Sequence, residues 1–441
     1  MIPRALPLLA MLIPATASSA EIGLSIPAPT KTVFDNGLRV IVMEDPSTPV
    51  ATVQVWYHVG SKNEVPGKRG LAHLFEHLMF RGTEKYGPGV FDDRLDAIGG
   101  VNNAFTSEDV TAYHESVPAE AIDVALELEA DRMRHLKLVQ ATVDSEREVV
   151  KEEKRLRLDN DPLGKTFEVF RSVAYTTHPY SWTPAGMLDD LASVTVPEAQ
   201  AFYDRWYQPN NAVLVVVGDV KTADVLAKAH RHFDAIPRGA EPSRAIAPEP
   251  PQRATRTKTL ELDTQLPILI GGYHVPGLAS ADMAPLEVLG VILSAGESSR
   301  LYRSLVKTKK LAVFAQGATE SFEDPGLFVV IAGFLPPTKP AQVERALLAE
   351  VERVAAKGVT ARELEKARNQ LLAGHVFGLD TVEGKGMSLG SAETLEGDYR
   401  KFLEETTKYE HVTVAQVQDV ARRYLVKKNL TMITLLPKEA P

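Results

Sequence analysis

Two histidines and a glutamate lie close together in the segment GLAHLFEHLMFRG at residues 70–82. Its apolar positions follow the period of a mostly buried helix, and Gly82 is a reasonable stop. On a helix, His73 and His77 are four residues apart and project from one face, so both imidazoles can bind one metal ion. Glu76 flanks the same face without having to be a ligand. Because the chain has no cysteine, a transition-metal site must use histidine and carboxylate ligands.

This set of side chains predicts hydrolysis at a zinc ion. Neutral imidazole suits Zn²⁺, and a catalytic zinc keeps three protein ligands and one open position for water. The metal lowers the pKa of that water to about 7 and polarises a peptide carbonyl. Glu76, beside the water, can take its proton and pass it to the leaving amine. The alternative is a pair of core histidines, but a buried helix rarely accepts two imidazoles and a carboxylate on one face without partners, and H-x-x-E-H is a zinc signature.

A third protein ligand is expected in the segment EREVVKEE at residues 146–153. If the segment is helical, Glu146 and Glu153 are seven residues apart, two turns along one face, while Glu152 points elsewhere. One of the pair could bind the metal and the other could hold a histidine in place. Spacing alone leaves this choice open, and a charge-rich helix often only faces solvent.

The elements that must position these residues include both strands and helices. We predict strands at 38–43, 51–56, 111–117, 212–217 and 430–436, and helices at 119–136, 145–158 and 197–206. Because strands are grouped and then followed by runs of helix, the pattern favours the α+β class.

The chain reads as two similar halves. A proline-rich stretch at 236–258 predicts a linker between an N-terminal domain at 21–235 and a C-terminal domain at 259–441. Tyr-His-Val triplets begin at Tyr57 and Tyr273, 216 residues apart. Near the end of each half, a helical stretch ending at Tyr207 or Tyr424 leads into an apolar strand, at almost the same offset. Two landmarks with one spacing favour a duplicated unit.

The first residues are typical of a secretory signal peptide. Arg4 provides a positive charge, an apolar stretch follows at 6–13, and Ser18 and Ala20 stand at −3 and −1 of a cleavage site near Ala20. We therefore expect a periplasmic or secreted protein, and no apolar run is long enough for a membrane span. The formal net charge of −9 argues against broad nucleic-acid binding.

The motifs together resemble the pitrilysin family of inverted-zincin metallopeptidases, in particular its short bacterial members. The resemblance covers nearly the whole mature chain. It rests on HLFEH at 73–77, ERxxVxxE at 146–153 and NAFTSEDVTAY at 103–113, with weaker similarity in HPY at 178–180 and SRLYRSLV at 299–306.

The resemblance implies roles for individual residues. It implies Zn²⁺ ligands at His73, His77 and Glu153, Glu76 as general base, and Glu146 in a supporting position. It also implies two homologous α+β domains that form one side of a clamshell chamber on dimerisation. A peptide substrate would add as a β-strand to the edge at Asn103, Ala104 and Phe105. Such pairing gains backbone hydrogen bonds whatever the side chains are.

The second half lacks the metal-binding pattern. With the 216-residue offset, the positions of His73, Glu76 and His77 fall near Leu289, Ile292 and Leu293, which are all apolar. We therefore expect one zinc ion per chain.

Active members of the family usually carry an Arg and a Tyr seven residues apart in the half without zinc, where they contact the substrate at the metal. In LVKTKKLAVF at 305–314 these positions fall on Val306 and Val313, which cannot donate a hydrogen bond. Arg300 and Tyr302 are close in sequence but have the wrong spacing. We therefore expect a homologous partner subunit that supplies the Arg/Tyr pair, with a homodimer as the alternative.

Three functions compete on this basis: an exported zinc endopeptidase for unfolded peptides, a non-catalytic core or assembly subunit of the same fold, and a metal-storage protein. The second would have no reason to retain a general base, and the third would not need Glu76. The endopeptidase is therefore favoured.

Overall fold

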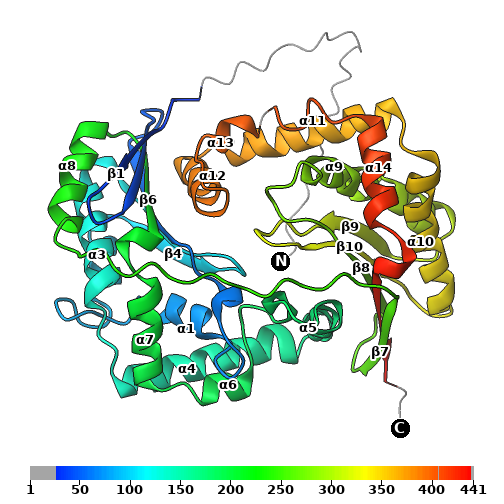
Figure 1. The fold of residues 1–441 in the computed structure, drawn as a ribbon, viewed down its shortest axis with the longest axis horizontal. Coiled ribbons are helices and arrows are strands. Elements are labelled where there is room, and N and C mark those ends of the chain that lie inside the picture. Colours follow the sequence, from blue (N-terminus) through cyan, green and yellow to red (C-terminus); the bar gives the residue numbers. More distant parts are fainter. Residues whose placement is uncertain (1–25, 406, 439–441) are drawn as a thin grey trace, which may run out of the picture.

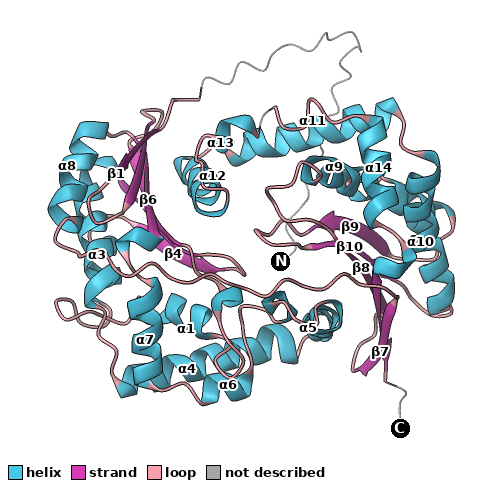
Figure 2. Ribbon diagram, viewed as in Figure 1, coloured by secondary structure: helices cyan, strands magenta, loops and turns pink. Residues whose placement is uncertain are grey.

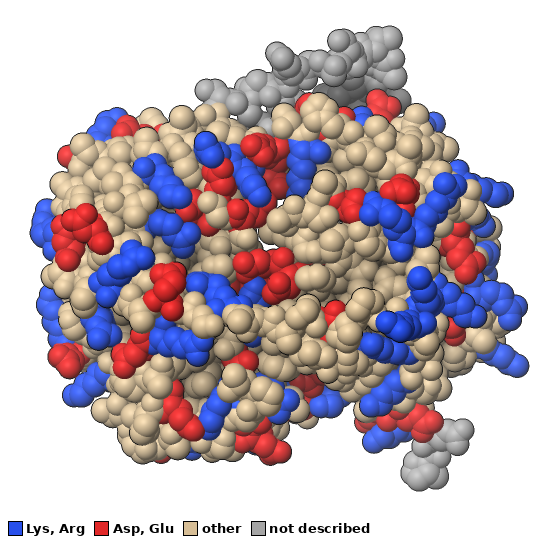
Figure 3. All heavy atoms as spheres, in the orientation of Figure 1, with Lys and Arg blue, Asp and Glu red and all other residues tan. Residues whose placement is uncertain are grey.

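The computed structural model describes residues 26–405 and 407–438, so the predicted signal peptide at 1–20 lies outside the described residues. Two mixed β-sheets stand opposite each other, each packed between helices (Figures 1 and 2). The predicted α+β class is confirmed. None of the helices within the described ranges has both the length and the apolar character that crossing a membrane requires. Figure 3 shows lysines and arginines interspersed with acidic residues over this face of the molecule.

The first sheet has six strands in the order β1-β2-β6-β3-β5-β4. Their bounds are β1 Thr30–Val33, β2 Arg39–Glu44, β6 Ala212–Gly218, β3 Val50–Tyr57, β5 Thr111–Pro118 and β4 Val101–Thr106. Only β2 and β6 pair in parallel; the other pairs are antiparallel. Strand β4 therefore forms one edge of the sheet and pairs with β5 alone.

The second sheet repeats this arrangement without a counterpart of β1. Its order is β7-β11-β8-β10-β9, with β7 Arg256–Leu262, β11 Leu430–Pro437, β8 Ile268–His274, β10 Leu327–Gly333 and β9 Phe314–Thr319. Here too one pair, β7 with β11, is parallel. Tyr57 and Tyr273 lie on the equivalent strands β3 and β8. Asn211 and Asn429 also correspond, since each side-chain amide donates to the carbonyl of the last residue of the preceding helix, Trp206 or Tyr424.

Each sheet carries its own layer of helices. The first layer consists of α1 Leu71–Leu78, α2 Val90–Asp96, α3 Ile122–His135, α4 Gln140–Lys154, α6 Leu188–Ala192, α7 Val196–Trp206 and α8 Thr222–Phe233. The second consists of α9 Met283–Ser294, α10 Pro340–Lys357, α11 Ala361–Gly378 and α14 Val414–Tyr424. Their apolar faces form two large, separate cores with the adjacent sheet faces.

The other face of each sheet is covered by a helix from the opposite half (Figure 1). Helix α12, Val382–Leu395, followed by the short α13, Lys401–Glu404, packs on the first sheet, and α5, Pro162–Ala174, packs on the second. Both contacts need a glycine. A Cβ at Gly390 would lie 2.2 Å from Nε1 of Trp56, and one at Gly272 would lie 2.3 Å from the Phe170 ring. This exchange joins the two halves through apolar contacts.

A buried charge cluster adds to this connection. Lys62, only 3% exposed, lies with Nζ 2.8 Å from Asp109 of the β4–β5 turn and 2.5 and 3.3 Å from Glu323 and Asp324 of the β9–β10 turn. Tyr180 donates its hydroxyl proton to Asp109 at 2.6 Å. The HPY segment at 178–180 therefore belongs to the contact between the halves.

Candidate active site

The first histidine-bearing helix, α1, begins at a left-handed residue and is capped by a distant carboxylate. Gly70 has φ 101°, a conformation that glycine adopts without strain. Both oxygens of Glu64 accept backbone N–H groups, from Gly70 at 2.9 Å and from Ala72 at 2.8 Å, which satisfies donors that a helix start leaves free. The helix ends at Leu78, four residues before Gly82, because the chain continues in tighter turns in which Arg81 N–H donates to Leu78 O at 2.9 Å.

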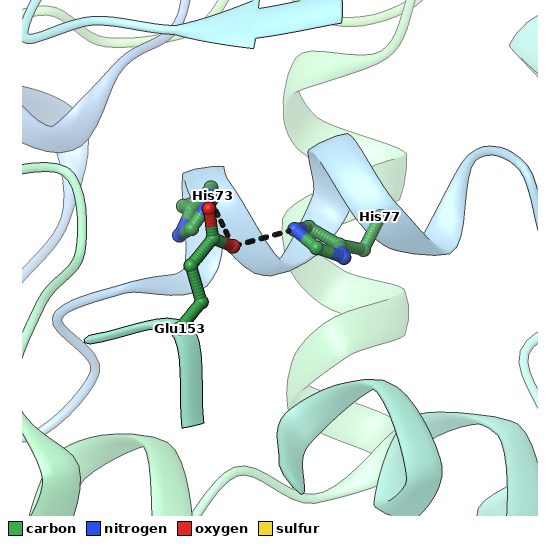
Figure 4. Close-up of side chains that lie close together, drawn as sticks. All are labelled: His73, His77 and Glu153. Atoms are coloured by element: carbon green, nitrogen blue, oxygen red, sulfur yellow. Dashed lines mark ion pairs between the residues drawn. The ribbon is translucent and has the colours of Figure 1, made fainter. Parts of the chain in front are cut away.

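Three side chains from α1 and α4 converge on one point. Figure 4 shows the imidazoles of His73 and His77 turned toward the carboxylate of Glu153. Oε2 of Glu153 lies 3.5 Å from Nε2 of His73 and 3.3 Å from Nε2 of His77. One ligand atom from each residue lies within 4.8 Å of the others. Two imidazole nitrogens and one carboxylate oxygen at these separations fit a zinc site that keeps an open position.

The protonation of the two imidazoles suits a metal. Burial, together with the neighbouring His77, lowers the pKa of His73 to about 4, so its ring is neutral at pH 7, the form that binds zinc. Burial also opposes the charged form of His77, but the carboxylates of Glu146, Glu153 and Glu76 outweigh it and raise its pKa. Carboxylates that favour a proton on His77 also favour a metal cation there, and a bound metal ion would displace that proton.

Glu146 lies behind His77 and Glu152 lies away from the site. Oε2 of Glu146 is 3.6 Å from Nδ1 of His77, and Nε of Arg81 is 2.8 Å from Oε1 of Glu146. Although burial acts in the opposite direction, His77 and Arg81 lower the pKa of Glu146, which keeps it ionised. Glu152 is instead 57% exposed and pairs with Arg155. Of the two glutamates between which the spacing left the choice open, Glu153 faces both histidines and Glu146 faces only His77.

Glu76 faces a pocket of about 350 Å³ that His73 and Glu153 also line. Burial raises the pKa of Glu76, against the lowering effect of the Thr106 hydroxyl. The pocket is lined by side chains from α1, β4, the α4–α5 region and a loop: His73, Glu76, Ala104, Phe105, Thr106, Glu153, Lys154, Arg157, Leu158, Thr183, Pro184 and Ala185. A carboxylate beside the metal-binding residues, at the wall of a pocket, is placed to accept a proton from a water molecule there.

Strand β4 presents an open edge to this pocket, and its register shows which backbone groups are free. Ser107 N–H donates to Val110 O across the turn, so hydrogen-bonded and non-hydrogen-bonded pairs alternate from there. In the β4–β5 register, Asn103 and Phe105 fall on bonded pairs and Ala104 on a non-bonded one. The Ala104 N–H accordingly donates to Oδ1 of Asn103 at 2.9 Å. An added strand would therefore meet the backbone of Ala104.

The same place in the second half is closed. Leu289, Ile292 and Leu293 are buried on α9. The Ser294 hydroxyl accepts the N–H of Gly317 at 2.5 Å and donates to its carbonyl at 2.6 Å. Helix α9 therefore uses backbone groups of the edge strand β9 that an added strand would need. Within residues 26–405 and 407–438, the one cluster of three or more potential metal ligands is His73, His77 and Glu153.

In the second half, neither the residues at the expected Arg/Tyr positions nor Arg300 nearby offers a free donor. Val306 is half-buried and packs against the second core, and Val313 is 47% exposed. Arg300 is engaged elsewhere, since Nε and Nη2 bind the two oxygens of Glu363 at 2.7 and 2.8 Å. Its bidentate pair leaves it poorly available as a substitute donor.

Three residues at the site were not predicted from the sequence. Arg157 lies four residues after Glu153, so the i, i+4 rule could have indicated it. Arg81 binds Glu146 of α4, a contact that no local spacing specifies. Thr106 depends on the β4–β5 pairing, which no spacing in the sequence specifies.

Comparison with known proteins agrees with this geometry. Residues 39–179 match the family model for insulinase, peptidase family M16, and residues 193–371 match the one for the peptidase M16 inactive domain. Zinc protease PqqE of Helicobacter pylori is 32% identical over 438 residues, covering 98% of both chains. An uncharacterized zinc protease of Mycobacterium tuberculosis is 31% identical over 408 residues, covering 91% of this chain and 92% of the relative.

The fold also has a counterpart among solved structures. The crystal structure of a protease from Helicobacter pylori has a TM-score of 0.89 and 33% identity, and the match covers 93% of this chain and all of that one, 100%.

Proposed function

The chain belongs to the M16 (insulinase) peptidase family, as its motifs predicted, and is a zinc protease; from this premise we propose that it is an endopeptidase for unfolded peptides. His73, His77 and Glu153 hold one Zn²⁺ and Glu76 is the general base. Two observations carry this proposal: ligand atoms of His73, His77 and Glu153 lie within 4.8 Å of one another. In addition, His73, Glu76 and Glu153 line a pocket together with the open edge of β4.

The residues of the site divide the work of hydrolysis. Zn²⁺, when bound, supplies the Lewis acid that activates water and polarises the peptide carbonyl. The substrate pairs with β4, where the Ala104 backbone exchanges its bond to Asn103 for one to the peptide. Glu76 takes a proton from the attacking water and passes it to the leaving amine. The carboxylate of Glu146, 3.6 Å from Nδ1 of His77, favours the proton on that nitrogen and leaves Nε2 for the metal.

Cleavage of a quenched peptide tests the proposal. A chelator should abolish the cleavage and Zn²⁺ should restore it. A protein that binds one equivalent of zinc but cleaves nothing, in any assembly recovered from its source, would instead be the non-catalytic subunit, the alternative function. Zinc bound in several equivalents without cleavage would indicate metal storage.

We further propose that the active assembly is a heterodimer with a homologous subunit that carries the Arg/Tyr pair. Hydrolysis develops negative charge on the carbonyl oxygen, which preorganised donors stabilise. Val306 and Val313 cannot donate, Arg300 is bound to Glu363, and a homodimer would place the same valines opposite each zinc. If the zinc-loaded chain alone cleaves peptides as fast as the assembly from its native source, the heterodimer proposal is wrong and the active form is a homodimer or a monomer.

Export is proposed from the residues alone. Arg4, the apolar stretch at 6–13 and the small residues before Glu21 support cleavage near Ala20. N-terminal sequencing of the protein from a periplasmic or culture-medium fraction tests this, and a retained Met1 in the mature protein would contradict it.

A further inference from the structure

The two glutamates of the site share one arrangement. Each turns Oε2 toward a histidine and gives Oε1 to an arginine. Oε1 of Glu146 lies 2.8 Å from Nε of Arg81, and Oε1 of Glu153 lies 2.6 Å from Nη1 of Arg157. Glu146 contacts only His77, whereas Glu153 faces both imidazoles (Figure 4). Arg157 therefore contacts a residue that itself faces the metal position.

Glu153 is the least constrained of the three candidate ligands. His73 and His77 share the short helix α1, whose apolar face is buried in the first core. Glu153 instead lies one residue before the end of α4, where the chain continues as a π-helix over Arg155–Asp159. A glutamate also has one more side-chain torsion than a histidine, so a carboxylate at this place needs a second contact to stay in one orientation.

We propose that Arg157 is a positioning residue of the metal site: by binding Oε1 of Glu153 it keeps Oε2 directed at the two histidines and makes the carboxylate a ligand through a single oxygen. This inference rests on the proposed zinc site. The π-helical turn contributes to it, because it places Arg157 at the rim of the pocket that Glu153 lines. Local widening of a helix of this kind is frequent at functional sites.

Exposure separates this contact from an ordinary surface pair. The Arg157 side chain is 77% exposed, but its partner Glu153 is only 20% exposed and faces the site. The neighbouring pair of Arg155 and Glu152 joins the same types of group at 3.1 Å, with 41% and 57% exposure, and points away from the site. Arg155 is therefore a matched control, with the same charge on the same turn.

The test compares Arg157→Gln, Arg157→Lys and Arg155→Gln in the full chain. The zinc dissociation constant is measured by competition with a chelator, and Co²⁺ is substituted for zinc to record its visible absorption spectrum, which reports ligand geometry. We expect Arg157→Gln to weaken zinc binding by roughly tenfold, as other residues that orient a ligand do, and to change the cobalt spectrum. Arg157→Lys should recover part of the affinity, because lysine retains the charge but not the planar fork.

Two results would overturn the proposal. One is an unchanged or higher zinc affinity with an unchanged cobalt spectrum in Arg157→Gln; the other is an equal loss in Arg155→Gln, which would reduce the effect to net charge. The readouts do not depend on cleavage. If the wild-type chain binds zinc and shows these differences but hydrolyses nothing, the proposed function fails and the role of Arg157 stands. If the wild-type chain binds no zinc, both fail.

Discussion

Oε2 of Glu146 lies 3.6 Å from Nδ1 of His77, while Nε2 of the same ring lies 3.3 Å from Oε2 of Glu153. The two nitrogens of one imidazole thus face two different carboxylates. Because the pKa of Glu146 is lowered by His77 and Arg81 in spite of burial, an ionised acceptor stands at Nδ1. The proton of the neutral ring then belongs on Nδ1, and the lone pair of Nε2 is directed at the metal position.

Glu146→Ala should therefore raise the zinc dissociation constant by roughly 10- to 100-fold without removing a ligand. Glu146→Gln should have a smaller effect, because the amide carbonyl still accepts the Nδ1 proton. Competition with a chelator measures both constants. Equal affinity of the Ala variant and the wild type would show that His77 needs no support from this side.

Replacement of a ligand has a larger effect than replacement of its support. His73→Ala, His77→Ala and Glu153→Ala should each lose stoichiometric zinc, since a site with two protein ligands holds the ion poorly. Glu152→Ala is the control, because its side chain is exposed and bound to Arg155. Metal analysis of the purified proteins decides this, and zinc retained by Glu153→Ala but lost by Glu152→Ala would contradict the assignment.

The helices that carry the site residues could be predicted from the sequence. The apolar period around His73 predicted a helix, and the structure has α1 there, shorter by four residues at its end because tighter turns replace the last helical bonds. The helix predicted at 145–158 is α4, Gln140–Lys154, continued by a π-helix. Helical periodicity is a local property, so it shows in the sequence.

What the sequence did not show depends on contacts between distant segments. Neither α5 nor α12 was predicted from the sequence, and nothing in their sequences indicates that each packs on the opposite sheet. Thr106 lies beside Glu76 because of the register of the β4–β5 hairpin, which only the folded turn specifies. The position of Arg157 at the pocket depends on the π-helix, which the sequence does not indicate.

The open edge of β4 gives a prediction on substrate binding. Ala104→Pro removes a backbone N–H that β5 does not use, and edge strands tolerate proline at such positions. The variant should fold normally and bind peptide more weakly by about 1 kcal/mol, roughly fivefold in KM. Asn103→Pro should instead lower the melting temperature, because it removes a bond to β5. An unchanged KM in a folded Ala104→Pro protein would argue against strand addition here.

The partner hypothesis predicts a gain of activity. The double variant Val306→Arg, Val313→Tyr gives a chain that carries both the metal site and the donors, so its homodimer should cleave peptides at least about tenfold faster than the lone wild-type chain. Removing one such donor from a working site costs about 100- to 1,000-fold. Initial rates at full zinc occupancy provide the comparison. Each single variant is the control, and no gain in the folded double variant would count against donors at these positions.

The most direct measurement concerns Glu76. Glu76→Gln keeps the size of the side chain and its contact with the pocket but cannot accept a proton from water. We expect this variant, assayed in the assembly in which the wild type cleaves a quenched peptide, to bind zinc as the wild type does and to lose about a hundredfold or more of the turnover. Turnover near the wild-type rate in a zinc-loaded Glu76→Gln protein would contradict the general-base assignment.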